Sequence, residues 1–343
     1  MKLHLLPQTA QHYKANMHTH TTLSDGELTP EEIKALYKSA GYQIIAYSDH
    51  DFCFPQAKLN DDGFLALTAY EVAINAHNPR SPYDKCYHFN LFARNPENVK
   101  QVCFDPVYGK EDLEGRPGLA ESLVIYNRED RIYSTEYANH LIEEANKAGF
   151  FVSYNHPRWS QQNYTDYIGL RGIWGIEVYN SDCGQGGFGE EDVRPFEDLL
   201  RAGVPVFPLA TDDIHAPQDA FGGFLMVAAK SLSYGDVIAA LENGDFYAST
   251  GALIHTLSLE DRKLKVVCDP AHHICVETEC RCAFRANAPT GETLTEAEFD
   301  LSDWYNICRE GDHIPAYFRL SIVDANGKRA WSRPYYLSEV TAE

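Results

Sequence analysis

The sequence has no long apolar segment. In 343 residues, no run approaches the ~20 apolar residues that a membrane-spanning helix requires. The first residues, 1–7, also lack the apolar core of a secretory signal. We therefore expect a cytoplasmic protein that does not bind membranes.

Several enzyme motifs are also missing. The chain contains no Gly-x-Ser-x-Gly elbow and no Walker loop. We therefore assign no protein nucleophile, and a hydrolytic reaction here would use an activated water.

Basic residues are few. The 29 Lys and Arg residues are outnumbered by 50 Asp and Glu residues, which gives a formal charge of -21. This charge disfavours binding to nucleic acid, and we expect no stable nucleic-acid partner. An anionic substrate is not excluded, because divalent ions reverse the potential locally.

Cysteine is present but has no recognisable pattern. The nine cysteines run from Cys53 to Cys308, and the close group Cys275, Cys280 and Cys282 does not have a familiar zinc spacing. We expect reduced thiols in or near a core.

Histidines and acids, in contrast, form motifs. In His18-Thr19-His20, two imidazoles two residues apart on an extended strand lie on the same side, and Asp25 in the next loop can fold back toward them. Together with later motifs, nine nitrogen and oxygen ligands are predicted, enough for more than one ion: His18, His20, Asp25, His50, Glu71, His88, His156, Asp213 and His215. Such a donor set suits manganese, iron or zinc.

Other polar residues near these motifs have separate expected roles. Asp213 is preferred over Asp212 because only Asp213 has the Asp-x-His spacing to His215. We expect Asp49 and Asp51 to orient His50. The remaining histidines have no supporting motif, and we expect ordinary roles for them: His4, His12, His77, His140, His255, His272, His273 and His313.

Three segments repeat an amphipathic helix, Ala-Gly, a short apolar strand and then ligands. The helices begin near Thr29, near Ser134 and before Phe196, and the strands are predicted at 44–47, 150–154 and 204–207. Alternating helices and apolar strands predict a parallel sheet whose carboxyl ends collect the ligands. We therefore expect a (β/α) barrel over roughly the first 250 residues.

The pattern changes after Gly251. Residues 256–269 alternate as a hairpin with a turn at Asp261-Arg262, and further strands are expected at 316–323 and 331–337. No helical periodicity is evident there. We expect a domain of residues 1–252 followed by a small antiparallel β-sandwich of residues 253–343.

The ordered motifs His18-Thr-His20, Ser48-Asp49-His50-Asp51, Glu71, His88, Asn155-His156-Pro157 and Asp213-x-His215 resemble those of the PHP (polymerase and histidinol phosphatase) superfamily, in particular its TrpH-like phosphoesterases. The resemblance covers roughly residues 14–250. It implies a distorted (β/α)7 barrel with two or three divalent ions (manganese, iron or zinc). It also implies three ligand groups: His18, His20, Glu71 and Asp213; Glu71, His88 and His156; Asp25, His50 and His215.

The leading hypothesis is a phosphoesterase that hydrolyses a small phosphate ester with a metal-bound hydroxide. Arg158 and Asn180 are candidates for substrate binding, although a barrel-rim salt bridge and a loop hydrogen bond explain them equally well. Two rivals stay open: a hydrolase of C–N or carboxylic ester bonds, and a noncatalytic binding or regulatory module. The exact substrate and a homo-oligomeric state are left open by the sequence.

Overall fold

A computed structural model describes residues 2–7, 10–78, 83–310 and 315–341, so that His313 lies outside the described residues. The first helix, α1 (Pro30–Ser39), forms where it is predicted. The hydroxyl of Thr29 accepts a hydrogen bond from the backbone N–H of Glu32, whose carboxylate accepts one from the backbone N–H of Thr29. The next strand, β3 (Ile44–Tyr47), matches its predicted bounds.

The second repeat also matches. Helix α4 (Thr135–Ala148) is capped by Ser134, ends at Gly149 with φ 97°, and leads into β8 (Phe150–Tyr154). In the third repeat, α7 (Arg194–Arg201) is followed by β10 (Phe207–Thr211), which begins where we expected the strand to end. Pro205 explains the shift, because it has no N–H to donate to a neighbouring strand.

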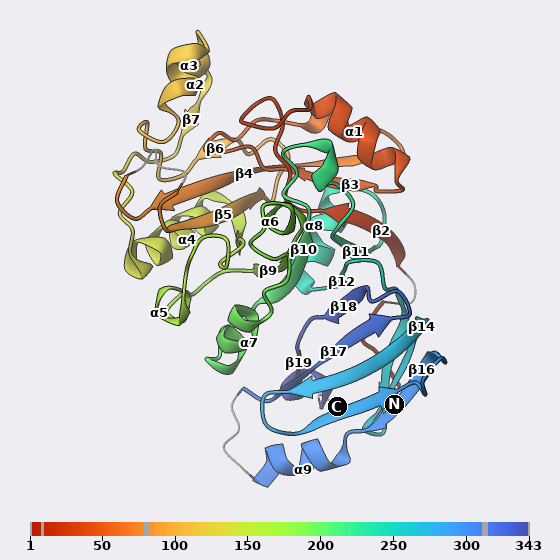
Figure 1. Ribbon diagram of the computed structural model, residues 1–343. Coiled ribbons are helices and arrows are strands. Elements are labelled where there is room, and N and C mark those ends of the chain that lie inside the picture. The colour runs from red at the N-terminus through yellow and green to blue at the C-terminus, as the bar shows by residue number, and fades with distance from the viewer. Residues whose placement is uncertain (1, 8–9, 79–82, 311–314, 342–343) are drawn as a thin grey trace.

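The strands of the first part pair in one continuous order (Figure 1). The parallel set β2 (Gln11–Asn16), β3 and β4 (Leu65–Asn75) is joined through β5 (Cys86–Ala93) to the parallel set β8, β9 (Gly175–Asn180) and β10. Strand β5 is antiparallel to both β4 and β8, so the expected all-parallel sheet is wrong at this point. The described residues of the short connection between β4 and β5 contain no helix, and the two strands pair antiparallel as a hairpin does.

The two edges of this sheet approach each other past the strand ends. A single parallel bridge joins Thr19 to Ile214, while β2 itself pairs antiparallel with β11 (Phe224–Ala229). The α/β class is therefore confirmed, but the described strands do not show a ladder that closes into a barrel.

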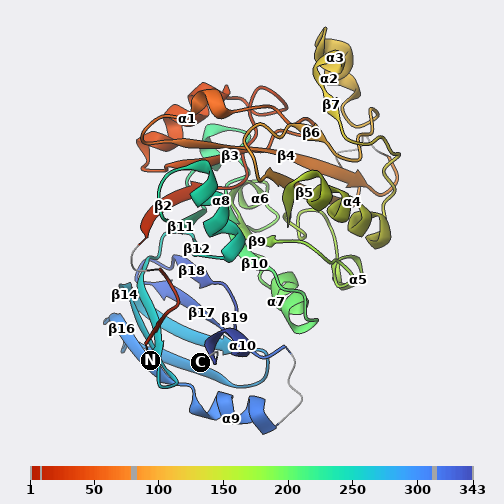
Figure 2. The ribbon, with the colours of Figure 1, turned by 180° about the vertical axis from the view of Figure 1, so that it is seen from behind.

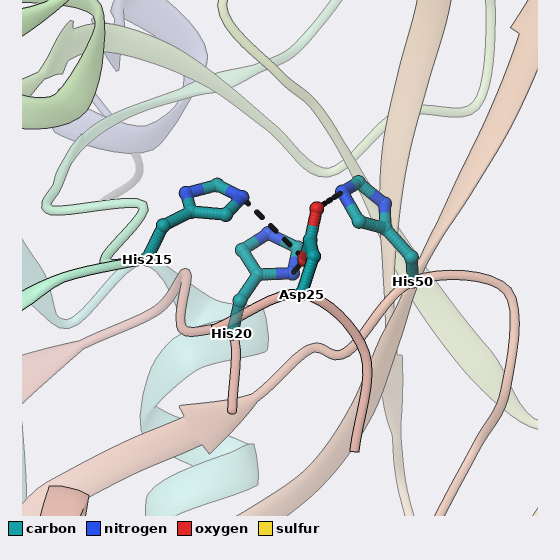
Figure 3. Close-up of side chains that lie close together, drawn as sticks. All are labelled: His20, Asp25, His50 and His215. Atoms are coloured by element: carbon teal, nitrogen blue, oxygen red, sulfur yellow. Dashed lines mark ion pairs between the residues drawn. The ribbon is translucent and has the colours of Figure 1, made fainter. Parts of the chain in front are cut away.

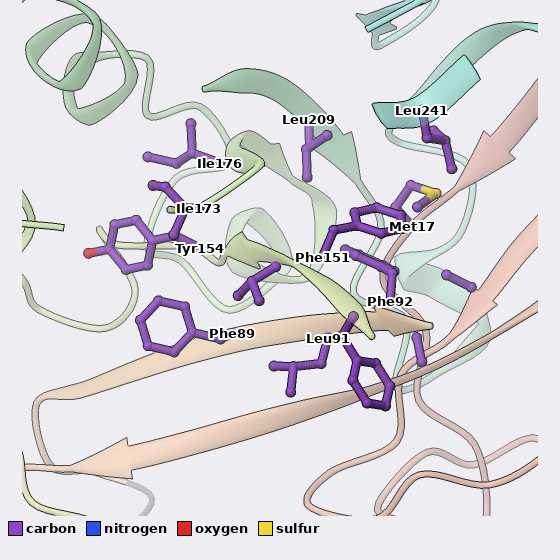
Figure 4. Packing of buried hydrophobic residues seen from close by; sticks show 14 of the residues in the cluster. Met17, Phe89, Leu91, Phe92, Phe151, Tyr154, Ile173, Ile176, Leu209 and Leu241 are labelled. Carbon is purple, nitrogen blue, oxygen red and sulfur yellow. The ribbon is translucent and has the colours of Figure 1, made fainter. Parts of the chain in front are cut away.

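Both faces of the strands are buried. Alternate residues of β3 enter two different apolar clusters: Ile44 and Ala46 lie in one, and Ile45 and Tyr47 pack with Ile33 and Tyr37 of α1 in the other. Figure 4 shows the larger cluster, where Leu91, Phe151 and Leu209 come from three strands. This two-sided burial explains the continuous apolar runs in the sequence.

Between β5 and α4 the chain forms an arm that projects from the sheet (Figures 1 and 2). The arm contains β6 (Lys100–Gln101), α2 (Lys110–Gly115), α3 (Leu119–Ser122) and β7 (Val124–Ile125), and β6 pairs with β7. The remaining helices of the first part are α5 (Tyr164–Tyr167), α6 (Ser181–Gln185) and α8 (Tyr234–Asn243), with 3-10 turns at Ala57–Leu59 and Pro217–Asp219.

The C-terminal part is antiparallel, as expected, and has its own apolar cluster. Strands β13 (Ile254–Glu260) and β14 (Lys263–Thr278) form the predicted hairpin, with positive φ at Asp261 and Arg262. The other strands are β15 (Ala283–Asn287), β16 (Leu294–Asp300), β17 (Tyr317–Asp324), β18 (Arg329–Ser332) and β19 (Tyr335–Tyr336). The last strand of the first part, β12 (Phe246–Ser249), pairs with β11 and with β18. The N-terminal β1 (Leu3–His4) pairs with β13.

The expectation of no helix after residue 251 is wrong. Helix α9 (Ser302–Glu310) buries Trp304 and Tyr305 in the C-terminal cluster, and α10 (Leu337–Val340) follows β19. Nine residues provide too few turns for an apolar period to stand out in the sequence. Of the helices in the described part of the chain, none has both the length and the apolar character of a membrane span.

Candidate metal centre

His18 and His20 meet Asp213 where β2 and β10 end. The backbone N–H of Asp213 donates to the carbonyl of His18 at 3.1 Å, which holds the two segments side by side. The Nε2 atoms of the two imidazoles are 3.1 Å apart, and each lies 3.1 Å from Oδ1 of Asp213. Three lone-pair donors of buried side chains therefore point to one position.

A second group lies beside the first and contains His20, Asp25, His50 and His215 (Figure 3). The carboxylate of Asp25 is 3.6 Å from Nδ1 of His20, 3.5 Å from Nε2 of His50 and 3.7 Å from Nε2 of His215. Desolvation raises the pKa of Asp25, but His50 and His20 lower it more, to about 2. The acid is thus ionised and faces three imidazoles.

Glu71 lies between these groups and connects them. Its Oε1 is 3.3 Å from Nε2 of His18, 3.2 Å from Nδ1 of His88 and 3.3 Å from Nε2 of His156. Its Oε2 is 3.1 Å from Nδ1 of His50 and 3.5 Å from Nε2 of His20. The two oxygens of one buried carboxylate therefore face two different sets of imidazoles.

We expected the ligands to follow the ends of the strands, but Glu71 lies within β4. The strand continues past the others because β5 pairs with it as far as Asn75, and His88 faces the centre from β5. A bridge between His50 and Glu71 keeps the extension beside the end of β3.

Carboxylates and imidazoles in the cluster shift one another's pKa values strongly. Burial lowers the pKa of His18, but Asp213 and Glu71 raise it well above its usual range. The pKa values of Glu71 and Asp213 are held well below their usual range by surrounding imidazoles, despite burial. His20 differs: burial and the neighbouring His215 and His50 lower its pKa to about 3.

The donor set and its contacts fit a metal ion better than a hydrogen-bonded network. Oδ1 of Asp213 and Nδ1 of His88 are buried and make no hydrogen bond of good geometry within the described residues. Asp213 and His156 also have positive φ angles, 53° and 26°. Strained backbone and unsatisfied buried atoms at one place are typical of a functional site.

The centre opens into a cavity of about 610 Å³. Eight carboxylates line it, and no Lys or Arg does so among the described residues. Trp159 and Tyr108 contribute aromatic surface, and the Cys86 thiol lies on the wall. The described cysteines form no disulfide and are buried or partly buried, as expected.

No family model matches the sequence, and no curated protein is significantly similar to it. Solved structures with similar folds include PHP-like proteins. A two-domain protein from Bacteroides vulgatus that contains a predicted PHP-like metal-dependent phosphoesterase is 15% identical, with 97% of each chain covered and a TM-score of 0.46. A lesion-specific endonuclease from Pyrococcus furiosus is 14% identical over 90% of this chain and 69% of its own, with a TM-score of 0.41.

A third similar structure is an amidohydrolase from Chromobacterium violaceum with bound sulfate and no metal. It is 15% identical over 68% of this chain and 96% of its own, with a TM-score of 0.39.

Glu177 is a residue of the centre that sequence reasoning did not select. Its Oε1 accepts hydrogen bonds from Nδ1 of His18 and Oγ1 of Thr211, both at 2.7 Å. Its Oε2 accepts from the backbone N–H of His156 at 3.0 Å. A carboxylate in the apolar run of β9 was the available signal, because an unpaired buried acid is costly.

The two candidates for substrate binding lie outside the cavity lining. Asn180 is buried and donates to Glu177 at 2.9 Å and to Asp213 at 3.0 Å, so its amide holds two acids of the centre. Arg158 is exposed and donates to the carbonyl of Glu191 at 3.4 Å.

The acids next to His50 also have different contacts from those expected. Asp49 accepts from the backbone N–H of Thr21 at 2.7 Å and from Ser24 at 2.9 Å, so it holds the loop that carries Asp25. Asp51 pairs with buried Arg131. Asp212 accepts hydrogen bonds from Tyr37 and from the backbone of Phe221 and Gly223, and it lies away from the cavity lining.

Proposed function

We propose that this chain is a metal-dependent phosphoesterase of the PHP superfamily that hydrolyses a small phosphate ester. One observation carries the proposal: Glu71 lies within 3.5 Å of five imidazoles, while Asp213 contacts two of them without a well-directed hydrogen bond. Such convergence of neutral and anionic donors favours divalent cations.

The ligands divide into three overlapping groups in this proposal. One ion would be held by His18, His20, Glu71 and Asp213, a second by Glu71, His88 and His156, and a third by Asp25, His50 and His215. The first set is supported by the cluster of His18, His20 and Asp213, and the third by the cluster that joins Asp25, His50 and His215 to His20, with donor atoms within 4.8 Å of one another in each. Glu71 and His88 form such a cluster with His50, and Oε1 of Glu71 is also 3.3 Å from Nε2 of His156. Two or three ions of manganese, iron or zinc fit the nitrogen and oxygen donors.

Divalent ions held there would neutralise the charge on phosphoryl oxygens and activate a water molecule. Other side chains of the protein orient the metal-binding residues. Glu177 fixes the ring of His18, Asn180 fixes Asp213 and Glu177, and Asp49 holds the loop of Asp25. These buried contacts preorganise the donors before a substrate arrives.

We further propose that the sheet from β2 to β10 is a distorted (β/α)7 barrel in a domain of residues 1–252, followed by a β-sandwich of residues 253–343. The bridge between Thr19 and Ile214 supports the barrel, because it joins the two edges of the sheet. The separate C-terminal apolar cluster supports the division into domains.

A second candidate is the hydrolysis of a C–N or carboxylic ester bond. The absence of Lys and Arg among the described cavity-lining residues favours it, because a neutral carbonyl substrate needs no cationic side chain. The same ions polarise a carbonyl oxygen.

The two candidates are separated by assaying the purified protein with manganese, iron or zinc on two panels. One contains phosphate monoesters and diesters, and the other contains amides, carbamates and carboxylic esters. Phosphate release would support the phosphoesterase proposal. Cleavage of the second panel alone would favour a hydrolase of C–N or carboxylic ester bonds. A protein that binds substoichiometric metal and cleaves neither panel would instead be a noncatalytic binding module.

A further inference from the structure

A second cluster of metal-binding side chains lies outside the candidate centre. The thiol of Cys103, a carboxylate oxygen of Glu129 and a ring nitrogen of His140 all lie within 4.8 Å of one another. They come from the turn after β6, the segment between β7 and α4, and α4 itself. We propose that these three residues bind one zinc ion, at a site independent of the hydrolytic centre.

The chemistry of the donors favours zinc over the ions proposed for the cavity. A thiolate, an imidazole and a carboxylate are all common zinc ligands, and three protein ligands leave a fourth position for water. We expected Cys103 to be an ordinary thiol and His140 an ordinary histidine, because residues 103, 129 and 140 have no recognised spacing. Folding brings them together.

The cluster has a buried side and an open side. Cys103 is fully buried, whereas the side chains of Glu129 and His140 are 27% and 44% exposed. An ion can therefore reach the thiol from solvent past the two outer ligands. Nε2 of His140 lies 2.8 Å from Oε2 of Glu129, and these partly exposed side chains need to separate only to roughly 3.3 Å to share a tetrahedral ion.

Asn127 holds Cys103 and Glu129 in place. Its amide nitrogen donates to Oε1 of Glu129 at 2.6 Å and lies 3.6 Å from Sγ of Cys103, and its amide oxygen accepts from the backbone N–H of Cys103 at 2.7 Å. Support of this kind around the ligands is typical of metal sites. The hydroxyl of Tyr137, one turn before His140, is buried beside the Cys103 thiol and makes no well-directed hydrogen bond in the described part of the chain.

The backbone of Cys103 is also unusual. Its φ is 48°, a conformation that residues with a β-carbon seldom adopt and that recurs at functional sites. Its carbonyl accepts from Nε of Arg131 at 3.2 Å, and Arg131 pairs with Asp51 on the cavity wall. The ion would thus fasten α4 to the base of the arm, close to a residue that shapes the cavity.

A cobalt titration of the full-length protein tests the proposal. Cobalt bound by a thiolate gives a charge-transfer band in the near ultraviolet, which nitrogen and oxygen ligands of the hydrolytic centre do not give. We expect this band in the wild type and its loss in Cys103→Ser. We expect His140→Ala to weaken zinc binding at this site by more than about tenfold.

Three controls separate this site from others. Cys86→Ser removes the thiol on the cavity wall and should leave the band unchanged. His255→Ala removes a comparable surface histidine, paired with Asp269 at 2.9 Å, and should leave zinc binding unchanged. Asp213→Asn should abolish hydrolysis while the band persists, which keeps failure of the catalytic proposal distinct from failure of this one.

The absence of the band in the wild type, or a band that survives Cys103→Ser, overturns the proposal. If Cys103→Ser fails to fold, His140→Ala decides, because this partly exposed residue can be truncated without disturbing a core. Unchanged zinc affinity in that variant would mean that the cluster is only a buried thiol beside a surface ion pair.

Discussion

Oε1 of Glu177 accepts a hydrogen bond of 2.7 Å from Nδ1 of His18, and both side chains are buried in the candidate metal centre. Because a carboxylate oxygen accepts this hydrogen bond, the shared proton lies on Nδ1 of His18, and the lone pair of Nε2 becomes available to a metal ion once Nε2 has lost its own proton. This contact determines which nitrogen of His18 serves the metal centre.

Glu177→Gln should therefore weaken metal binding without unfolding the protein. The amide keeps the shape of the side chain but loses the charge that orients His18, and we expect about 10–100-fold lower metal affinity. Isothermal titration with manganese measures the change, and activity should recover at high metal concentration. Glu136→Gln, on the exposed first turn of α4, is the matched control. Unchanged manganese affinity would mean that Glu177 contributes only to packing and not to the orientation of His18.

Asp213→Asn should abolish turnover while the fold is kept. Loss of the carboxylate should lower kcat by at least about a thousandfold, equivalent to about 4 kcal/mol. Asparagine tolerates the φ of 53° at this position, so circular dichroism and Tm should change little. Asp261→Asn is the control, because Asp261 has a similar φ of 49° in an exposed hairpin turn. Full activity of the Asp213 variant would remove the basis of the catalytic proposal.

Gly26→Ala should displace the loop that carries Asp25. A Cβ at this position would lie 2.6 Å from the backbone C and O of His20 and 2.7 Å from N of Thr21. Because backbone cannot yield as a flexible side chain does, we expect a loss of about 1–3 kcal/mol in the free energy of unfolding, measured by urea denaturation. Gly235→Ala in α8 meets no atom within 4 Å and should be neutral or slightly stabilising.

The metal-free protein should lose stability as pH rises. Carboxylates raise the pKa values of His18, His88, His156 and His215 above 6.5, so their protonated forms stabilise the fold fully below that pH. This contribution disappears as pH rises through the raised values. In the presence of EDTA, we expect Tm to fall by at least about 2 °C, the shift that ~1 kcal/mol produces.

Metal ions should make Tm rise with pH instead of fall. They compete with protons for the same imidazoles and therefore bind more tightly as pH rises. Thermal melts with and without manganese, across the same pH range, measure both effects. A metal-free protein whose Tm rises from about pH 6.5 upward would contradict the cluster electrostatics described here.

Local patterns predicted local structure well. The capping box at Thr29, Ser134 before α4, Gly149 after it, and the Asp261-Arg262 turn each depend on neighbouring residues, and each forms as expected. The direction of β5 and the existence of α9 were not predicted, because pairing partners distant in sequence determine the first and packing on the C-terminal cluster determines the second.

The amino-acid sequence alone determined which residue types are available to the candidate centre and where they follow apolar strands. Only the tertiary structure decided that Glu71 faces both sets of imidazoles, that Glu177 and Asn180 orient the donors, and that Arg158 lies outside the cavity lining. Only folding, likewise, brings Cys103, Glu129 and His140 together. The reason is physical: motif spacing reflects local backbone geometry, whereas contacts between distant segments depend on how the whole sheet and its helices pack.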